Sequence, residues 1–421
     1  MAGDLTIHKL GPKGDGIHES ARGRIYVERA LPGDVVQAKI HRGDDGILRG
    51  RIAQIIRPSE HRITPLCPFY ESCGGCSAQH MEDAWYREWK QDIVREALHR
   101  QGLNPRHWRD PVFIGPGTRR RATFALFKKG KALHMGYYRR RSRQVADIPA
   151  CLVTAPEIMD LRARVLPLIA PVVQEGRAVD VFIQMAGGAF DLAITGPVGR
   201  KGQPDLALRE AAARLIAETP VARVSWRARE RDAPELVLER DKPVAAFGAL
   251  RVVLPPMAFL QPTRDGEAAL TGAVMDLLPE RGKFADLFSG CGTFTGPMLA
   301  RGPVDAYESV DPAIRALNGA RGTLPLRAIR RDLFKNPLRR DEANRYDAIV
   351  FDPPRAGCAE QARTLASGRV PVLVGVSCNP ATFARDARTL VDGGYRLETV
   401  QVVDQFTWSH HVELVAQFTK K

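Results

Sequence analysis

The sequence predicts a multidomain chain whose last domain is an α/β fold with a doubly wound, Rossmann-like sheet. Three observations lead to this prediction. Residues 1–57 form short strands between Gly, Pro and Asp turns, residues 58–258 join a cysteine-rich segment to a strand-rich stretch, and residues 259–421 alternate strands with helices. We therefore predict a small β-barrel, a central α+β domain and a C-terminal α/β domain. The length of 421 residues fits three domains of roughly 150 residues each.

Composition excludes several classes of protein. With 44% hydrophobic and 26% charged residues the chain is globular, and the net charge of +14 favours a polyanionic partner such as nucleic acid. No apolar run reaches the roughly 18 residues of a membrane span, and the first residues lack the apolar core of a signal peptide. We therefore expect a cytoplasmic protein that binds no membrane.

The predicted barrel rests on four strands at residues 5–9, 23–27, 34–41 and 48–56, the last two with alternating apolar and polar residues. Small barrels of this kind often hold oligonucleotides. The alternative is a packing module with no ligand.

The central domain opens with a Pro-, Gly- and Cys-rich segment, and an apolar stripe then predicts a helix at residues 82–101. Residues 119–143 contain ten Lys or Arg and no acid, with Phe and Tyr interleaved. Such a surface can neutralise phosphates while an aromatic ring stacks on a base. The alternative is a solvated charged face over core aromatics.

The C-terminal domain is predicted to have seven strands, of which the last two form a hairpin. They are expected at residues 284–288, 304–308, 327–331, 348–351, 370–376, 399–403 and 412–418.

Four successive strands of this domain end in acids: Asp286, Glu308, Asp332 and Asp352. The first leads into Ser289-Gly-Cys-Gly-Thr293, where backbone amides can approach a ligand closely. Glu308 is placed to accept bonds from ribose hydroxyls, and Asp332 from an adenine amine. The loop lacks the third glycine of the dinucleotide fingerprint, which favours S-adenosylmethionine over NAD.

Two further residues suggest chemistry. Cys378 follows the fifth strand, at the edge where open α/β sheets bind substrates. Glu413 stands in an otherwise apolar strand, where a carboxylate is costly without a role. The alternatives are a buried, inert thiol and an edge-strand acid that faces water.

Three cysteines are spaced as Cys67-x5-Cys73-x2-Cys76, which indicates a metal or cluster site in a reducing compartment. Cys291, Cys358 and Cys378 belong to other motifs, so Cys151 is the fourth ligand by elimination. Four thiolates could hold zinc or a [4Fe–4S] cluster, and the spacing alone does not decide between them.

Several motifs occur together and in order: Phe259-Leu-Gln261, Asp286-Leu-Phe-Ser-Gly-Cys-Gly-Thr-Phe294, Asp352-Pro-Pro-Arg-Ala-Gly357, Ser377-Cys-Asn-Pro-Ala-Thr382 and His411-Val-Glu413. In these motifs the chain resembles the RNA uracil-C5 methyltransferase family, which makes 5-methyluridine in ribosomal and transfer RNA. The resemblance covers essentially the whole chain. The cysteine-rich segment and the barrel, which looks like a TRAM domain, are similar to the ribosomal RNA branch.

This resemblance implies a class I methyltransferase fold for residues 259–421 and a [4Fe–4S] cluster on the four cysteines. It makes Cys378 the nucleophile, Glu413 the general base and Asp352 a residue at the meeting point of donor and uracil. It also implies contacts with the methyl donor from Gln261, Phe288, Thr293, Glu308 and Asp332. The chain departs from the family where Thr293 replaces a common Asn, which puts one donor contact in doubt.

We therefore expect a monomeric, S-adenosylmethionine-dependent enzyme that methylates uridine C5 in RNA, with 23S ribosomal RNA favoured over transfer RNA. One alternative is a nucleic-acid amino-methyltransferase, but Arg355 stands where an aromatic often follows Asp-Pro-Pro, and that chemistry has no use for Cys378. The other is a non-catalytic iron–sulfur RNA-binding protein. It would leave the four strand-end acids and the pair of Cys378 and Glu413 unexplained.

Overall fold

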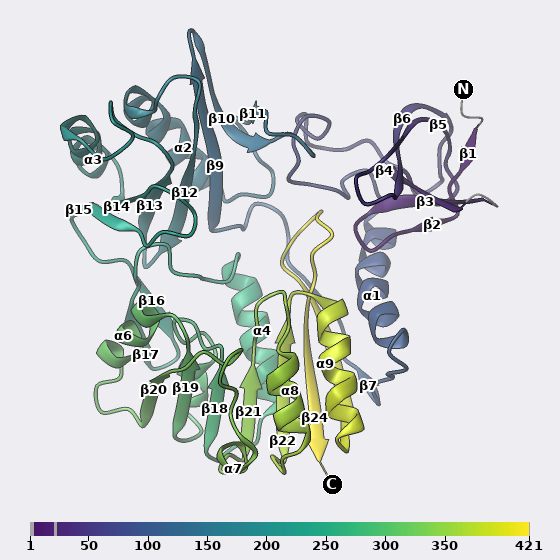
Figure 1. Cartoon of the computed structure of the whole chain (residues 1–421), viewed down its shortest axis with the longest axis vertical. Coiled ribbons are helices and arrows are strands. Elements are labelled where there is room, and N and C mark those ends of the chain that lie inside the picture. Colours follow the sequence, from purple (N-terminus) through teal and green to yellow (C-terminus); the bar gives the residue numbers. More distant parts are fainter. Residues whose placement is uncertain (1–3, 21–22, 421) are drawn as a thin grey trace.

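The computed structural model describes residues 4–20 and 23–420, so the outermost positions of the predicted first and third domains lie outside it. Within this part, strands form sheets of six, seven and nine strands and one two-stranded hairpin. Figure 1 shows the seven-stranded sheet above the nine-stranded one, with the six-stranded sheet to one side next to the N-terminus.

The six-stranded sheet has the order β1-β5-β6-β4-β3-β2. Its end strands β1 and β2 are consecutive in the chain and separated by two residues, so the sheet curves until its two edges approach each other. This is the barrel-like unit expected from the sequence, which missed β3 and merged β1 with β2. The strands are β1 (Leu5–Thr6), β2 (Lys9–Leu10), β3 (Asp15–Ser20), β4 (Gly23–Glu28), β5 (Val35–Arg42) and β6 (Leu48–Arg57).

The seven-stranded sheet has the order β11-β10-β9-β12-β13-β14-β15 and is antiparallel except between β13 and β14. Two amphipathic helices pack their apolar faces on it and complete one hydrophobic core. The elements are β9 (Arg121–Lys129), β10 (Ala132–Tyr138), β11 (Val145–Asp147), α2 (Pro156–Ile169), η1 (Ala170–Val172), β12 (Ala178–Ala186), β13 (Ala189–Thr195), α3 (Leu206–Glu218), β14 (Val221–Arg227) and β15 (Glu235–Glu239).

The nine-stranded sheet has the order β20-β19-β18-β21-β22-β24-β23-β7, with β8 also paired to β23. The order reverses between β18 and β21, and ligands bind beyond the carboxyl ends of strands at such a point. The predicted terminal hairpin is confirmed, and β24 lies antiparallel between β22 and β23. The strands are β7 (His107–Trp108), β8 (Val112–Phe113), β18 (Phe284–Leu287), β19 (Val304–Glu308), β20 (Leu326–Arg330), β21 (Ala348–Phe351), β22 (Val372–Ser377), β23 (Tyr395–Asp404) and β24 (Glu413–Lys420).

Helices cover both faces of this sheet, as expected for a doubly wound fold. A hairpin of two short strands packs beside them, with Phe247 and Leu250 in the same core as the sheet. These elements are β16 (Val244–Phe247), β17 (Leu250–Val253), α1 (Asp83–His99), α4 (Arg264–Leu277), α5 (Thr295–Met298), α6 (Asp311–Ala320), α7 (Arg340–Ala343), α8 (Ala359–Ala366) and α9 (Pro380–Asp392).

The C-terminal unit differs from the predicted range 259–421 at its boundary. Strands β7 and β8 extend the nine-stranded sheet, and α1 packs on β23 and α9, with Ile93 and Val94 in the shared core. The β16–β17 hairpin also joins this unit. An apolar stripe shows which face of a helix is buried but not which element covers it, so the sequence placed residues 83–113 in the central domain instead.

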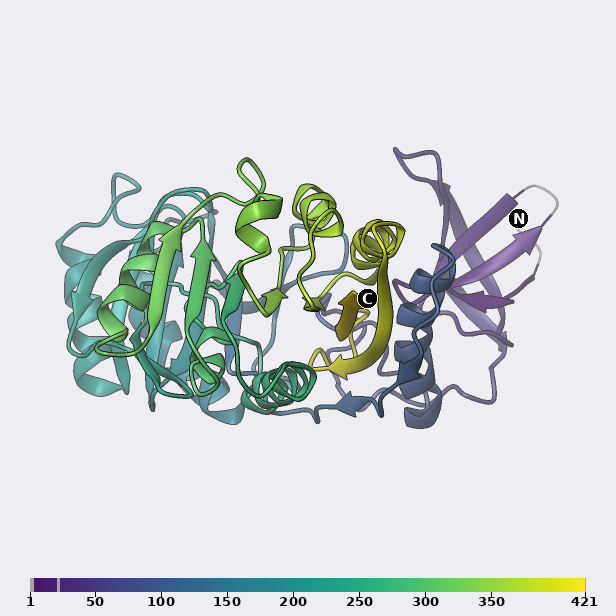
Figure 2. The same cartoon turned by 90° about the horizontal axis from the view of Figure 1, so that it is seen from below.

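Helix α1 connects the N-terminal sheet to the C-terminal unit. Figures 1 and 2 show it between the purple strands and the yellow C-terminal elements. Its Trp89 ring nitrogen donates to the Gly11 carbonyl at 3.3 Å, and Leu31 of the first unit joins the same core. Across residues 4–20 and 23–420, none of the helices combines the length and apolar character that a membrane span requires.

Candidate active site

A cavity of about 840 Å³ opens beyond the carboxyl ends of the parallel strands and extends towards the central sheet. Ten of the twelve predicted site residues line it. They are Cys67, Cys73, Cys76, Cys151, Gln261, Phe288, Glu308, Asp352, Cys378 and Glu413. The other two, Thr293 and Asp332, are not among its lining residues.

The predicted donor loop follows β18. Phe288 and Gly290 adopt positive φ angles of 63° and 54°, which turns the backbone sharply at the strand end. Glu308, at the end of β19, accepts the Gly290 N–H at 3.1 Å, and its other oxygen accepts the Ser309 and Val310 N–H groups. The Glu308 carboxylate is thereby fixed at the rim of the cavity, where a ribose could meet it.

Asp286 does not face the cavity. Its side chain is fully buried, and one carboxylate oxygen accepts the Thr295 hydroxyl at 2.5 Å. Burial raises the pKa of this carboxyl to about 7. Asp286 therefore stabilises the loop after β18 through its bond to Thr295 and does not line the cavity.

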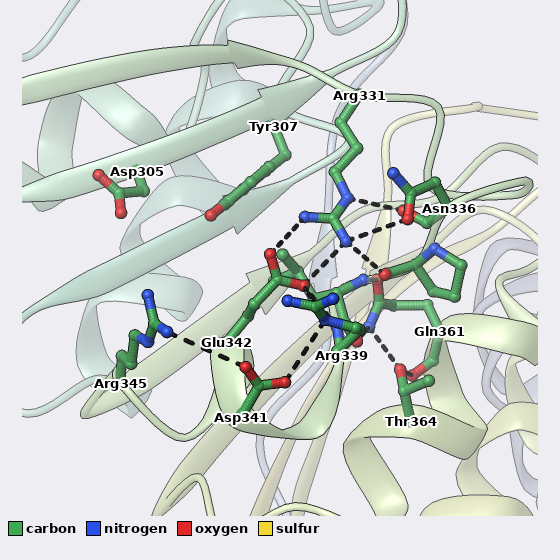
Figure 3. A network of polar contacts seen from close by, with 12 residues as sticks. Asp305, Tyr307, Arg331, Asn336, Arg339, Asp341, Glu342, Arg345, Gln361 and Thr364 are labelled. Carbon is green, nitrogen blue, oxygen red and sulfur yellow. Dashed lines mark hydrogen bonds and ion pairs between the residues drawn. The ribbon is translucent and has the colours of Figure 1, made fainter.

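Asp332 closes its own turn, because its carboxylate accepts the Phe334 N–H at 3.1 Å and the Lys335 N–H at 3.3 Å. The neighbouring Arg331, which the sequence analysis did not identify, stabilises the loop that follows β20. Figure 3 shows its guanidinium on both oxygens of Glu342, each at 2.9 Å, and it also donates to the Pro337 carbonyl at 2.6 Å. This arginine lowers the pKa of Glu342 to about 2.

The two candidate catalytic residues lie on neighbouring strands. Cys378 directly follows β22, and Glu413 is the first residue of β24, which pairs with β22 through Ser377 and Leu414. Because β24 runs antiparallel, its start lies at the same sheet edge as the carboxyl ends of the parallel strands. Asp352, directly after β21, borders the same cavity.

The electrostatics of this group are unusual. Burial raises the pKa of the Cys378 thiol to about 11, aided by the charges of Glu413 and Asp352, while Arg355 opposes this. Burial also raises the pKa of both the Asp352 and the Glu413 carboxyls, and the Asp352 charge raises the pKa of Glu413 further. Such a cluster of perturbed groups in a cleft is typical of an active site.

Glu413 is 5% exposed, and its carboxylate accepts a hydrogen bond from the side-chain amide of Gln405. The sequence analysis did not identify Gln405. Gln405 donates to a Glu413 oxygen at 3.5 Å and to the Gln261 side-chain oxygen at 2.7 Å. The side-chain oxygen of Gln405 is buried and has no hydrogen-bond partner among the described residues. The only sequence signal for Gln405 is its position directly after an apolar strand.

The four predicted cysteine ligands come from two segments that meet at the cavity. Cys67, Cys73 and Cys76 lie between β6 and α1, and Cys151 lies between β11 and α2. Burial raises the pKa of the first three thiols, and the Cys151 thiol adds to this shift in each. All four are free thiols, and within the described ranges no three His, Cys, Asp or Glu side chains are arranged to hold a metal ion.

The predicted basic face is divided between two roles. Arg119 and Arg121 line the cavity, and no salt bridge to either occurs among the described residues. Arg140 and Arg141 instead pair with Glu28 at 2.9 Å and Asp15 at 3.3 Å, acids of the six-stranded sheet.

The aromatics of this run are divided too. Phe124 is fully buried and packs against Tyr137 with 5.3 Å between ring centroids, so it is a core residue. Tyr137 lines the cavity, whereas Tyr138 is 39% exposed.

Comparison with known proteins identifies the family. The profile of the family described as tRNA (Uracil-5-)-methyltransferase matches residues 330–421. RNA methyltransferases of Caulobacter vibrioides and Mesorhizobium japonicum are 38% and 36% identical to the chain and align over 99% and 100% of it, and over 100% and 98% of their own lengths. The chain belongs to the RNA uracil-C5 methyltransferase family. It is an S-adenosylmethionine-dependent RNA (uracil-C5)-methyltransferase.

Two further relatives of this methyltransferase carry more specific names. The 23S rRNA (uracil(1939)-C(5))-methyltransferase RlmD of Vibrio parahaemolyticus is 29% identical over 99% of the chain and 95% of its own length. The crystal structure of the Pyrococcus abyssi tRNA (uracil-54, C5)-methyltransferase with S-adenosyl-L-homocysteine aligns over 99% of both chains with a TM-score of 0.76 and 21% identity. The second likeness supports the class I methyltransferase fold.

Proposed function

We propose that this enzyme methylates C5 of a uridine in 23S ribosomal RNA, as a monomer in the cytoplasm, through a covalent bond between Cys378 and uracil C6. One observation carries this proposal: the candidate catalytic residues and three predicted donor contacts line the same cavity. The first are Cys378, Asp352 and Glu413, and the second are Gln261, Phe288 and Glu308. The ribosomal target is supported by the similarity to RlmD along nearly the whole chain.

The chemistry needs a nucleophile because uracil C5 alone is too weakly nucleophilic to take a methyl group. The Cys378 thiol releases its proton to water, and its thiolate sulfur adds to C6, which moves the C5–C6 π electrons onto the C4 oxygen as an enolate. S-adenosylmethionine, when bound, supplies the methyl group as an electrophilic carbon on a sulfonium. C5 of the enolate would bond to this methyl carbon as its bond to the donor sulfur breaks, which releases the donor as a neutral thioether and restores the C4 carbonyl.

Elimination then completes the cycle. The Glu413 carboxylate removes the C5 proton, the electron pair of the C5–H bond restores the C5–C6 double bond, and the Cys378 thiolate leaves C6. Glu413 needs to be ionised for this step. To reach both groups, the uridine is turned out of its base stack.

The direct test of the proposed target compares RNA substrates. A 23S ribosomal RNA transcript should accept a methyl group at one uridine C5, and ribosomal RNA from a deletion strain should lack that modification when mapped. Transfer RNA transcripts serve as the matched comparison. Methylation of transfer RNA alone would reject the ribosomal assignment while leaving the covalent mechanism open to its own tests.

We also propose that Cys67, Cys73, Cys76 and Cys151 hold a [4Fe–4S] cluster. Four soft thiol ligands that face one cavity fit such a group by their donor chemistry. Burial raises the pKa of the Cys67, Cys73 and Cys76 thiols, which favours their protonated forms when no metal is bound. Bound iron would favour the thiolate forms instead. The ribosomal RNA branch that the chain resembles carries this cluster.

Iron analysis checks this assignment. Anaerobically purified protein should be brown and contain about four irons per chain, and Cys151→Ser should lose them as completely as Cys73→Ser does. Cys358→Ser, at a buried cysteine far from this segment in sequence, is the control and should keep the iron. Colourless protein with one zinc would reject the cluster, and an iron-replete Cys151→Ser would reject the fourth ligand.

RNA binding should depend on the two cavity arginines. Exchanging Arg119 and Arg121 for Gln should weaken RNA binding and reduce the slope of log affinity against log salt by about one per arginine. Lys129→Gln is the control, because Lys129 is exposed and does not line the cavity. An unchanged salt slope in the double variant would make these arginines a charged face without an RNA contact.

A further inference from the structure

We propose that Lys90, Tyr86 and Asp404 are positioning residues for methyl transfer, because they clamp the loop of residues 405–412 that leads into Glu413. We name these three residues the α1 clamp, since two of them lie on α1. The inference rests on the proposed function through the role of Glu413.

The centre of the α1 clamp is a buried ion pair. Lys90 is fully buried, and its ammonium group lies 2.9 Å from a carboxylate oxygen of Asp404, the last residue of β23. The same ammonium group donates to the His411 carbonyl, two residues before Glu413. One side chain of α1 thus holds both ends of the loop.

Tyr86, one helical turn before Lys90, holds the middle of the loop. Its hydroxyl donates to the second oxygen of Asp404 and accepts the Trp408 N–H at 3.0 Å. The Phe406 N–H donates to the first oxygen of Asp404 at 3.0 Å. The Asp404 carboxylate therefore receives bonds from the ammonium, the phenol and the loop backbone.

A second set of bonds holds the loop from outside the clamp. The Ser77 and Ala78 N–H groups, directly after Cys76, donate to the Trp408 carbonyl at 2.8 and 3.0 Å. Trp408 has a positive φ of 57°, a conformation that bulky residues rarely adopt without support. The Thr407 hydroxyl donates to the Ile114 carbonyl at 2.7 Å.

The clamped loop carries groups that border the reaction. Gln405 directly follows Asp404 and reaches Glu413 and Gln261. His411 lines the cavity and accepts from Arg355 at 3.3 Å, and Arg355 in turn lowers the pKa of Cys378. A small shift of the loop would therefore misplace the base relative to C5, and misplacement by about 1 Å can cost about 100-fold in rate.

Stability alone does not account for a buried ion pair. Removing two charges from water is costly, and exchanging such a pair for apolar residues is often neutral or stabilising. Burial lowers the pKa of Lys90, and Asp404 opposes that shift. Apart from the Asp404 carboxylate, the Lys90 ammonium has one hydrogen-bond acceptor among the described residues, and it is on the loop.

The test separates positioning from folding. Lys90→Met should lower kcat about 100-fold, change the KM for the methyl donor less than about twofold, and accumulate a methylated RNA–protein adduct because elimination is slowed most. Tyr86→Phe keeps the charges and should lower kcat about 10-fold. Glu96→Gln, at an exposed residue of α1, is the control and should match the wild type.

The double variant Lys90→Met/Asp404→Asn decides the outcome. It also removes the Asp404 charge that Lys90→Met leaves unpaired, so the thermal midpoint should recover towards the wild type. The kcat should stay low, because the His411 carbonyl still lacks its hydrogen-bond donor. Recovery of kcat together with the thermal midpoint would overturn the proposal, as would wild-type kcat in folded Tyr86→Phe. Full turnover by Glu413→Gln would instead reject the proposed function, whatever the clamp variants do.

Discussion

Cys378→Ala should abolish methyl transfer, with the rate falling on the order of 10⁴-fold or more. The variant lacks the sulfur that adds to C6, so no enolate forms and C5 stays too weak a nucleophile. No covalent RNA adduct should form either, including with RNA that carries 5-fluorouridine at the target. Transfer of a labelled methyl group and denaturing gel electrophoresis measure the two effects.

Two controls keep this result interpretable. Cys358→Ala removes another thiol, one that is 2% exposed and lies outside the cavity lining, and should retain methyl transfer. Cys378→Ala itself should bind S-adenosylmethionine as the wild type does, because the predicted donor residues lie on other segments, before α4 and at the ends of β18, β19 and β20. Substantial turnover by Cys378→Ala would reject the covalent mechanism outright.

The C-terminal sheet could be predicted closely from the sequence. Its core strands are short, apolar and buried on both faces, as in residues 348–351, so each stands out between helical stretches. Strand-end residues such as Glu308 and Cys378 then share one edge by topology alone. This explains why most predicted site residues line one cavity.

The partners of several segments could not be predicted. Periodicity identifies a buried face, and only the tertiary structure shows that α1, β7 and β8 complete the C-terminal unit. Arg140 and Arg141 resemble the other cations of their run in sequence, yet acids of the first sheet pair with them. Charge patterning reports the sign of a face and not the groups opposite it.

The site prediction was incomplete for a related reason. The donor contact of Asp332 stays a prediction, and the sequence did not indicate that its carboxylate also accepts backbone N–H groups of its own turn. The sequence did not indicate that Lys90 is buried or has a role, because a lysine beside an apolar helical stripe is usually exposed. Residues that act through other residues leave little trace in a single sequence.

Glu413→Gln should stop the reaction after methyl transfer. Gln is nearly isosteric and neutral, so Cys378 can still add to C6 and C5 can still take the methyl group. The amide cannot accept the C5 proton, so the thiolate is not expelled, and a methylated RNA–protein adduct that survives denaturing electrophoresis should accumulate.

The dependence on pH distinguishes base catalysis from a structural role for this residue. Burial and the Asp352 charge raise the pKa of Glu413, so its ionised, proton-accepting form grows as pH rises, and the wild-type rate of elimination should rise with it. In Glu413→Gln that rise should vanish while the adduct persists.

RNA with 5-fluorouridine should trap the wild-type enzyme in the same way, because fluorine cannot leave as a proton does. If Glu413→Gln turns over without an adduct while the fluorinated RNA still traps the wild-type enzyme, the base is another residue, and Asp352, the other carboxyl whose charge reaches Cys378, is the next to exchange.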